Sequence, residues 1–326
     1  MRRENVVGRA NVEDRPELLE YYRELEGREL GALWNVANEI EPWQPQPKSV
    51  PMLWKWRAIE PLVRRAPKLV SAEKAARRVV MLVNPGRKEW SAAVGLLYSG
   101  VQIMNPGEFT SAHRHQASAL RFVMEGKGAY TVVDGERMTL GARDFVLTPN
   151  GTWHDHGVDA EGTQCIWQDG LDIPLMNSLD ANFYEVHPQT VQTPSPLSRE
   201  NWTRPYSPVF LYKWDESFKS LRRDKAFEYK NPLTGGTVMP TMGARLELIE
   251  KDTRPVRHTG SVIYQVATGR GWSEVGGQRF EWEEKDIFCV PSWTRYRHGA
   301  PGEAVLFSFN DFPAMRALSL YRETHD

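Results

Sequence analysis

Three histidines, at positions 113, 115 and 154, have the spacing that most directly suggests chemistry. His113 and His115 lie two apart in GEFTSAHRHQASALRF (107–122), and His154 follows in PNGTWH. Alternate side chains of a β-strand share a face, so His113 and His115 project to one side, and a histidine from a partnering strand can complete a triangle. Neutral imidazoles bind iron, zinc, copper or nickel, and three ligands on one side leave positions open. The spacing therefore predicts a metal site, although a lone histidine in a sheet is more often a hydrogen-bonded core residue.

These histidines require strands to position them, and the sequence predicts strands from about Trp90 onward. Short apolar runs such as GAYTVVD and DFVLTP alternate with turns, a pattern typical of an antiparallel sandwich or barrel. The earlier residues differ, since 15–38 has the apolar spacing of an amphipathic helix and 57–79 suggests more helix, with a start at Ser71. The two cysteines lie in apolar runs, and we expect them to be reduced and unpaired.

The β-region repeats itself. EGKG (125–128) resembles TGRG (268–271), and after a one-residue gap RDFVLTPNGTWHDH (143–156) matches KDIFCVPSWTRYRH (285–298). An internal duplication is the economical explanation. The predicted organisation is a helical N-terminal arm (1–89), a first β-domain (90–187), a linker (188–210) and a second β-domain (211–326).

The second half lacks the histidine triad. On the repeat alignment, the positions of His113, His115 and His154 are occupied by Val256, His258 and Tyr296. Two of the three candidate ligands are therefore missing, so we expect metal in the first domain only. For His258 and His298 the expected role is hydrogen bonding or packing.

The amino-acid composition argues against nucleic acids and acidic membranes as binding partners. The 326 residues carry 41 basic and 42 acidic side chains, with no basic block typical of nucleic-acid or acidic-membrane binding. No apolar run approaches the roughly 18 residues of a membrane span, and the first residues lack the apolar core of a signal peptide. We expect a cytoplasmic protein whose partner is a small molecule.

The two histidine segments also resemble a known family pattern. Gly107 to His115 and Gly141 to His154 resemble the two motifs of the cupin superfamily. The segments HRHQASALRF, LTPNGTWHDHG, QDGLDIPL and PSWTRYRHG are similar to the gentisate dioxygenase family, which includes salicylate, nitrosalicylate and 1-hydroxy-2-naphthoate dioxygenases. The resemblance covers nearly the whole chain. It implies an all-β bicupin, two double-stranded β-helix (jelly-roll) barrels behind a helical arm, assembled as a homotetramer.

For the chemistry, the resemblance implies Fe(II) in the first barrel, held by His113, His115 and His154. The expected reaction splits an aromatic ring between its carboxyl-bearing and hydroxyl-bearing carbons and inserts both atoms of O2. Many cupins carry a glutamate shortly after the second histidine, but Ala119 and Leu120 occupy those positions here. A divalent metal with three neutral ligands keeps its charge and favours an anionic chelator, such as an ortho-hydroxybenzoate.

Further pocket residues follow from the same resemblance. Arg121 is expected to bind the substrate carboxylate, because a buried guanidinium needs an anionic partner; the alternative is a structural pair with a nearby aspartate. His156 is expected beside the substrate as a proton donor or hydrogen-bond partner. The other expected pocket residues, each of which has an ordinary structural alternative, are Asp169, Gln102, Tyr98, Trp153 and one of Arg77 and Arg78.

Other functions stay open at this point. The ring cleaved could be that of gentisate, of salicylate or 5-nitrosalicylate, or of 1-hydroxy-2-naphthoate; MNP (104–106) and Tyr98, where some relatives carry tryptophan, put plain gentisate specificity in doubt. A cupin isomerase would need no oxygen and usually retains the glutamate. A non-catalytic ligand-binding bicupin is a third alternative, against which the intact first-site histidines weigh.

Overall fold

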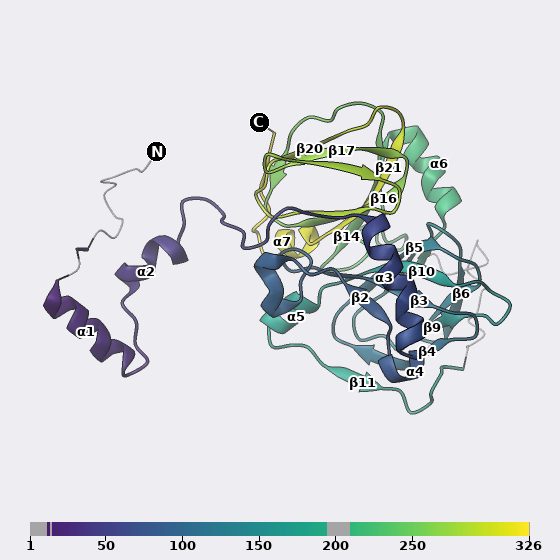
Figure 1. Cartoon of the computed structure of the whole chain (residues 1–326), viewed down its shortest axis with the longest axis horizontal. Helices are drawn as coiled ribbons and strands as arrows, with labels where there is room; N and C mark the ends of the chain where they lie inside the picture. The colour runs from purple at the N-terminus through teal and green to yellow at the C-terminus, as the bar shows by residue number, and fades with distance from the viewer. Residues whose placement is uncertain (1–11, 14, 194–208, 326) are drawn as a thin grey trace. The chain divides into compact units, whose positions relative to one another are not determined.

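The computed structural model describes residues 12–13, 15–193 and 209–325 (Figure 1), so most of the predicted linker 188–210 lies outside the described residues. Contacts divide the chain into a unit of residues 1–46 and a larger unit of residues 47–326. Residues 1–89, predicted as one helical arm, therefore divide, because 47–89 belong to the larger unit. None of the helices within the described residues is long and apolar enough to cross a membrane.

The smaller unit contains α1 (Pro16–Glu26) and α2 (Leu33–Ile40). The predicted single helix over 15–38 is wrong in its continuity, because α1 ends at Gly27. Glu29 then adopts a positive φ of 55°, which a continuing α-helix does not permit. The predicted helix start at Ser71 is confirmed, since its side chain accepts a hydrogen bond from the backbone N–H of Lys74.

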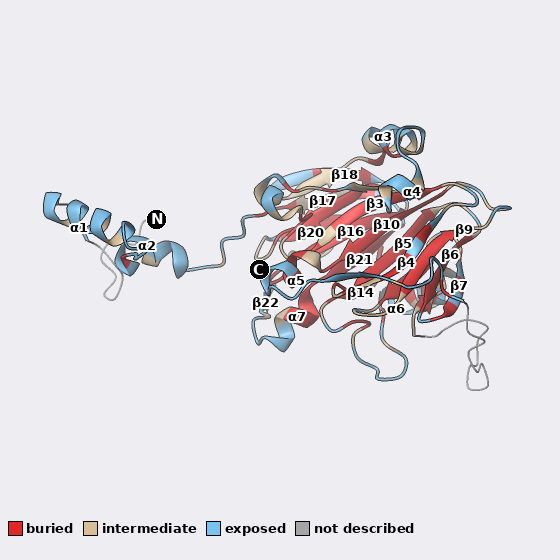
Figure 2. Ribbon diagram, turned by 90° about the horizontal axis from the view of Figure 1, so that it is seen from below, coloured by how far each residue is buried: buried red, intermediate tan, exposed pale blue. Residues whose placement is uncertain are grey.

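The two β-domains expected from the repeat are both present as antiparallel barrels. Figure 2 shows that the buried residues concentrate in their strands. In the first barrel, one sheet has the order β12-β8-β5-β10-β3-β2 and the other β11-β4-β9-β6-β7. The bounds are β2 (Val79–Met81), β3 (Tyr98–Met104), β4 (Phe109–His115), β5 (Ala119–Glu125), β6 (Ala129–Val133), β7 (Glu136–Leu140), β8 (Phe145–Thr148), β9 (His154–Val158), β10 (Cys165–Leu171), β11 (Tyr184–Val186) and β12 (Leu211–Tyr212), with α4 (Ala72–Ala75), a 3-10 helix η1 (Pro85–Trp90) and α5 (Ile173–Ser178) beside them.

The second barrel repeats this plan. Its main sheet has the order β1-β19-β16-β21-β14-β13, faced by β18-β17-β20 and the pair β15-β22. The bounds are β1 (Met52–Trp54), β13 (Ala226–Glu228), β14 (Gly243–Ile249), β15 (Arg257–His258), β16 (Val262–Thr268), β17 (Arg270–Val275), β18 (Gln278–Glu283), β19 (Ile287–Val290), β20 (Tyr296–Gly299), β21 (Ala304–Asn310) and β22 (Glu323–Thr324), with α3 (Trp56–Leu69), α6 (Trp214–Asp224) and α7 (Phe312–Ala317).

Edge strands are exchanged between the barrels. Strand β1 precedes the first barrel in sequence but pairs with β19 of the second, whereas β12 follows the first barrel and pairs with its β8. Each exchanged strand leads into a helix whose first backbone N–H donates to a buried aspartate: Trp56 to Asp286 (2.7 Å) and Trp214 to Asp144 (2.9 Å). These are the aspartates that the repeat aligned. An anion at a helix N-terminus is stabilising. Asp286 of the second barrel therefore binds the segment that precedes the first barrel, and Asp144 of the first barrel binds the segment that precedes the second.

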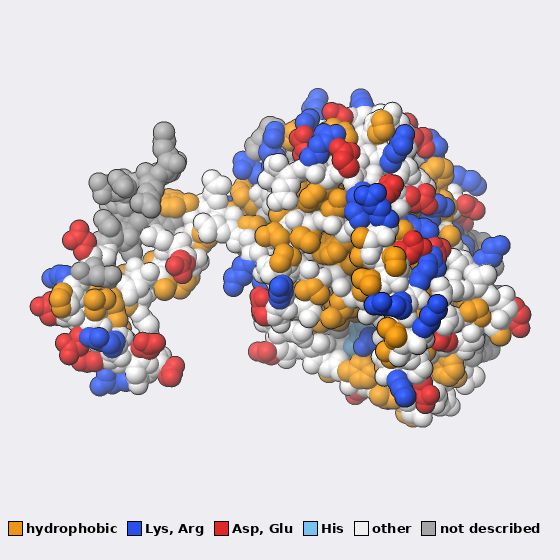
Figure 3. All heavy atoms as spheres, viewed as in Figure 1, with side chains coloured by type: hydrophobic (Ala, Val, Ile, Leu, Met, Phe, Trp, Pro, Cys, Tyr) orange, Lys and Arg blue, Asp and Glu red, His pale blue; other side chains and the backbone are white. Residues whose placement is uncertain are grey.

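The barrels share one apolar core. Phe122 of β5 stacks on Phe307 of β21 with ring centroids 4.0 Å apart, within a cluster that draws on both barrels. Gly170 of β10 lies in this contact, since a Cβ there would meet Phe309 at 2.6 Å and Leu120 at 2.8 Å. On the face of the larger unit drawn in Figure 3, basic and acidic side chains are interspersed, in line with the nearly balanced charge of the sequence.

We predict that Gly170→Ala lowers the free energy of unfolding by about 1–3 kcal/mol, because the added methyl must displace the buried side chains of Phe309 and Leu120 from a close-packed contact. Urea unfolding followed by circular dichroism measures this. The matched control is Gly302→Ala, where a Cβ meets nothing within 4 Å. Equal stabilities of the two variants would contradict the close packing inferred between the barrels.

Candidate metal centre and its cavity

A bulge in β4 aims His113 and His115 inward. Pairing of β4 with β9 runs Thr110↔His156 and then His113↔His154, so one extra residue lies on β4 between these pairs. The backbone of Ala112 is bonded instead to the segment after β11: its N–H donates to Thr190 O, and its carbonyl accepts from the N–H of His187. A bulge reverses the alternation of side chains, and without it Thr110 and His113 could not face the same interior.

The structure brings the three predicted histidines together. One ring nitrogen from each of His113, His115 and His154 lies within 4.8 Å of the others. All three side chains are buried, and their ring centroids are 4.3–5.7 Å apart. No other such group of His, Cys, Asp and Glu occurs among the described residues.

Backbone carbonyls fix the tautomer of each imidazole. Nδ1 lies 2.6 Å from Ser111 O in His113, 2.7 Å from Ala117 O in His115 and 3.0 Å from Thr152 O in His154. A carbonyl only accepts, so each Nδ1 carries the proton and each Nε2 presents a lone pair. The Nε2 atoms of His113 and His154 are buried and have no hydrogen-bond partner. Unsatisfied, converging imidazole lone pairs fit a metal ion that prefers nitrogen ligands.

The surroundings keep these imidazoles neutral. Burial, reinforced by nearby positive groups, lowers the pKa of His113 to about 3 and that of His115 to about 4. Burial also holds the pKa of His154 well below its usual range. A metal therefore need not displace protons from the triad near neutral pH.

A cavity of about 400 Å3 opens beside the triad. It is lined by Ala75, Ala76, Arg77, Val79, Met81, Tyr98, Gln102, His115, Arg121, Asp169, Leu171 and Ile173. The predicted residues Gln102, Tyr98, Arg121 and Asp169 all belong to this lining, which combines apolar and polar side chains.

Arg121 and Asp169 face each other across the pairing of β5 with β10. Arg121 Nε lies 3.3 Å from Asp169 Oδ1, and Arg121 Nη1 donates to Thr148 Oγ1 at 2.7 Å. Both residues are 4% exposed, and burial raises the pKa of Asp169 to about 6 although Arg121 opposes this. The structural pair considered for Arg121 thus exists, and the guanidinium lines the cavity as well.

Arg121 does not share a strand with His113 and His115. The chain bends between His115 and Ala119, and β5 belongs to the sheet opposite β4. Arg121 reaches the cavity from that sheet.

His156 is buried behind Gln102 and is not among the residues that line the cavity. Gln102 Nε2 donates to His156 Nε2 at 3.1 Å, so the proton of the neutral ring is on Nδ1, which is buried without a partner. Burial holds the pKa of His156 well below its usual range. Its contact with the cavity therefore runs through Gln102.

The side chains of Arg77 and Arg78 point in different directions, and only Arg77 faces the cavity. Arg77 is exposed and lines the cavity, whereas Arg78 is 6% exposed and points away, with Nη1 2.9 Å from Glu108 Oε1. Arg78 also donates to Ile103 O, so it is a structural residue.

Tyr98 lines the cavity as predicted, but Trp153 does not. Trp153 packs under Arg114 and against His187. Sequence reasoning also missed Tyr184 of β11, whose ring stacks on His113 at 5.3 Å with Arg77 placed 5.7 Å over it. Only the pairing of β11 with β4 reveals this contact, because no motif contains Tyr184.

In the second barrel a hydrogen bond closes the equivalent position. His258 Nε2 lies 3.0 Å from the hydroxyl of Tyr296, the residue that replaces His154. His258 and His298 pack and hydrogen-bond there as expected, because His298 Nδ1 also lies 2.7 Å from Ser273 Oγ.

Comparisons with known proteins agree with this geometry. Residues 100–174 match a cupin domain. The chain is 36% identical to gentisate 1,2-dioxygenase 1 of Aquipseudomonas alcaligenes, over 94% of this chain and 96% of the relative. It is 33% identical to 5-aminosalicylate 1,2-dioxygenase of a Comamonas species, over 90% and 86% of the two chains.

Solved structures agree as well. The fold matches salicylate 1,2-dioxygenase from Pseudoaminobacter salicylatoxidans, determined with gentisate, with a TM-score of 0.89 and 30% identity over 97% of this chain and 96% of that one. The two barrels, the histidine triad and these full-length similarities together establish that the chain belongs to the gentisate 1,2-dioxygenase family of bicupin ring-cleaving dioxygenases.

Proposed function

We propose that this dioxygenase uses Fe(II) to open the ring of a 2-hydroxybenzoate, between its carboxyl-bearing and hydroxyl-bearing carbons. The observation that carries the proposal is the convergence of unsatisfied Nε2 lone pairs from His113 and His154, with His115, beside a cavity that contains a guanidinium. Fe(II) bound there would supply a Lewis-acidic centre that orients the chelating ring and lets electron density pass from it to O2.

The charge of the site favours a substrate that is itself an anion. Three neutral imidazoles leave the metal's double charge uncompensated, and Arg121 and Arg77 add two cations, against which Asp169 supplies one carboxylate. In our proposal Arg121 binds the substrate carboxylate from inside, with its angle set by Thr148 and Asp169. Arg77 closes over the same group from the rim, held at Tyr184.

In our proposal the buried polar residues around the substrate's aromatic ring position it and exchange protons with it. Gln102 lines the cavity, and its amide is fixed by His156, so His156 acts as a positioning residue. Asp169, with its pKa raised to about 6, can hold or release a proton near neutral pH at a carboxylate that already contacts Arg121. Tyr98 completes the wall with a phenol ring.

The ring itself is the finer question. The relatives act, by their names, on gentisate, 5-aminosalicylate, 1-hydroxy-2-naphthoate and 5-nitrosalicylic acid. Gentisate is easier to oxidise than salicylate because of its second hydroxyl group, and we propose it or a substituted salicylate as the substrate. Assembly as a homotetramer stays a prediction.

We predict oxygen consumption with loss of aromatic absorbance when protein reconstituted anaerobically with Fe(II) is mixed with air-saturated substrate. Gentisate, salicylate, 5-nitrosalicylate and 1-hydroxy-2-naphthoate are compared side by side in an oxygen electrode. Protein reconstituted with Zn(II) serves as the control and should consume none. Fully iron-loaded protein that is inert toward all four compounds would overturn the proposal.

We predict that His113→Ala reduces bound iron to background, because two imidazoles hold a divalent ion far more weakly than three. Metal analysis of gel-filtered protein measures this. His258→Ala removes the aligned histidine of the second barrel and should leave the iron content unchanged. Equal iron in the two variants would remove His113 from the ligand set.

The adjacent arginines provide a second test. Arg77→Gln should raise KM about tenfold, equivalent to about 1.4 kcal/mol, with an unchanged melting temperature, because the change removes an exposed cation that has no ion pair among the described residues. Arg78→Gln should do the reverse, lowering stability by about 2–3 kcal/mol with KM retained, since Glu108 loses its partner. Steady-state kinetics and thermal melts of both variants distinguish the two roles. A stability loss in Arg77→Gln together with a raised KM in Arg78→Gln would reverse them.

A further inference from the structure

The second barrel encloses a cavity of its own, of about 530 Å3. It occupies the place that corresponds to the catalytic cavity, since its lining includes His258, Tyr296 and His298, which align with His115, His154 and His156. No candidate metal cluster occurs there among the described residues. What remains is a larger cavity with different chemistry.

This cavity also contains an arginine, Arg245, but on a different strand from the one that corresponds to β5 and Arg121. In the first barrel, one row across three strands reads Arg121, Asp169, Gly100; in the second, the corresponding row reads Tyr264, Ser308, Arg245. The arginine thus lies on β14 in place of β16, and a serine replaces the aspartate.

Arg245 is accessible to a ligand. It lines the cavity with 39% of its side chain exposed, and Nη2 lies 2.6 Å from Glu247 Oε1. That contact uses one of its nitrogens and leaves the others of the guanidinium for an anion. Ser308, its fully buried neighbour in register, has a hydroxyl without a hydrogen-bond partner.

A buried imidazole donor lies in the same wall. Trp282 Nε1 donates to Ser273 Oγ at 2.8 Å, and Ser273 Oγ lies 2.7 Å from His298 Nδ1. No other acceptor for the Ser273 hydroxyl proton occurs among the described residues, so the hydroxyl donates to Nδ1, which places the imidazole proton on Nε2. His298 is 2% exposed, and this Nε2 has no partner. An unsatisfied buried donor is costly, and an anionic oxygen would satisfy it.

The mouth of the cavity carries further cations. Arg254 and Arg316 are exposed and line it, with no ion pair to either among the described residues. Of the lining carboxylates, Glu247 is engaged by Arg245 through Oε1, with its Oε2 unpartnered, and Glu323 is engaged by Tyr321 and His325, which leaves Glu228 on β13. The lining includes three aromatic rings, those of Tyr296, Phe312 and Tyr321, beside smaller apolar side chains.

We propose that the second barrel contains a non-catalytic binding site for a small aromatic carboxylate, in which Arg245 and the Nε2–H of His298 bind the anionic group and Arg254 and Arg316 attract it at the mouth. The site is separate from the ring-cleaving cavity and requires no metal. It goes beyond the proposed reaction, because a carboxylate without an ortho-hydroxyl can occupy it.

The test uses 4-fluorobenzoate, which lacks the hydroxyl needed for chelation, and 19F NMR titration of the full-length protein. Arg121→Gln is introduced first to weaken the catalytic site. In that background binding should persist; adding Arg245→Gln should weaken it at least tenfold, and adding Arg316→Gln, at the exposed mouth, several-fold. Binding lost with Arg121→Gln alone, or unaffected by both second-barrel changes, would overturn the proposal.

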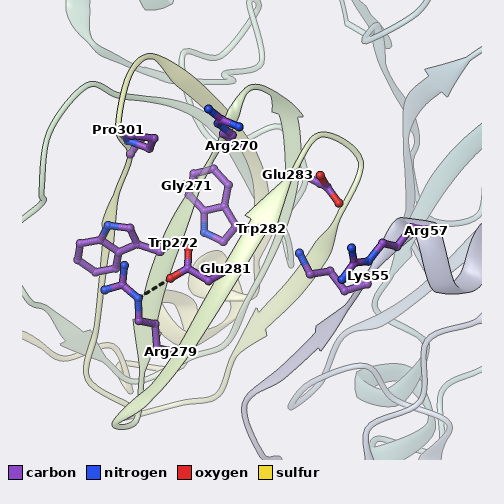
Figure 4. A pocket seen from close by; sticks show the side chains of 11 residues that line it. Lys55, Arg57, Arg270, Gly271, Trp272, Arg279, Glu281, Trp282, Glu283 and Pro301 are labelled. Carbon is purple, nitrogen blue, oxygen red and sulfur yellow. Dashed lines mark hydrogen bonds and ion pairs between the residues drawn. The ribbon is translucent and has the colours of Figure 1, made fainter.

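The matched control is Arg270→Gln. Arg270 lies in a hollow on the outer face of β17 and β18 (Figure 4), where Arg279 is paired with Glu281 and the buried Trp282 already donates to Ser273. This change removes the same charge from the same barrel and should leave the affinity unchanged. If Arg245→Gln lowers the melting temperature markedly, the exposed Arg316→Gln and Arg254→Gln variants decide, and unchanged affinity in both contradicts the proposal. No turnover is needed, so this result is independent of the oxygen assay.

Discussion

Strand β5 is buried on both faces, and this constraint links the fold to the chemistry. Leu120 and Phe122 face the second barrel, where Phe122 stacks on Phe307, while Arg121 between them faces the cavity. Because successive side chains of a strand point to opposite faces, the packing of Leu120 and Phe122 against the second barrel fixes the direction of the Arg121 guanidinium. The same holds for β10, which presents Asp169 to the cavity and Gly170 to Phe309. The packing between the barrels therefore sets where Arg121 and Asp169 enter the cavity.

Much of this could be predicted from the sequence. Spacing and a repeat of about 142 residues placed the triad in the first barrel and excluded it from the second, because ligand type and strand alternation are local properties. The resemblance to a known family then supplied the pocket residues, and Gln102, Tyr98, Arg121 and Asp169 do line one cavity.

The remainder depends on tertiary structure that no local pattern records. The bulge between Thr110 and His113 changes which side chains face inward, and its backbone is satisfied by a segment more than seventy residues away. The choice of Arg77 over Arg78 depends on Glu108, and the stacking of Tyr184 on His113 depends on an added edge strand. His156 was expected beside the substrate, but in the structure Gln102 lies between His156 and the cavity.

The exchange of edge strands has a consequence for how the chain is made. Strand β1 is synthesised early yet finds its partner, β19, only after residue 290, and β8 waits for β12 at residues 211–212. On the ribosome, the main sheet of the first barrel can be completed once residues 211–212 have been made, whereas that of the second barrel needs β1, which precedes the whole first barrel. The second half therefore cannot complete its main sheet from contiguous sequence, and a cut between residues 187 and 211 separates each barrel from one of its own strands.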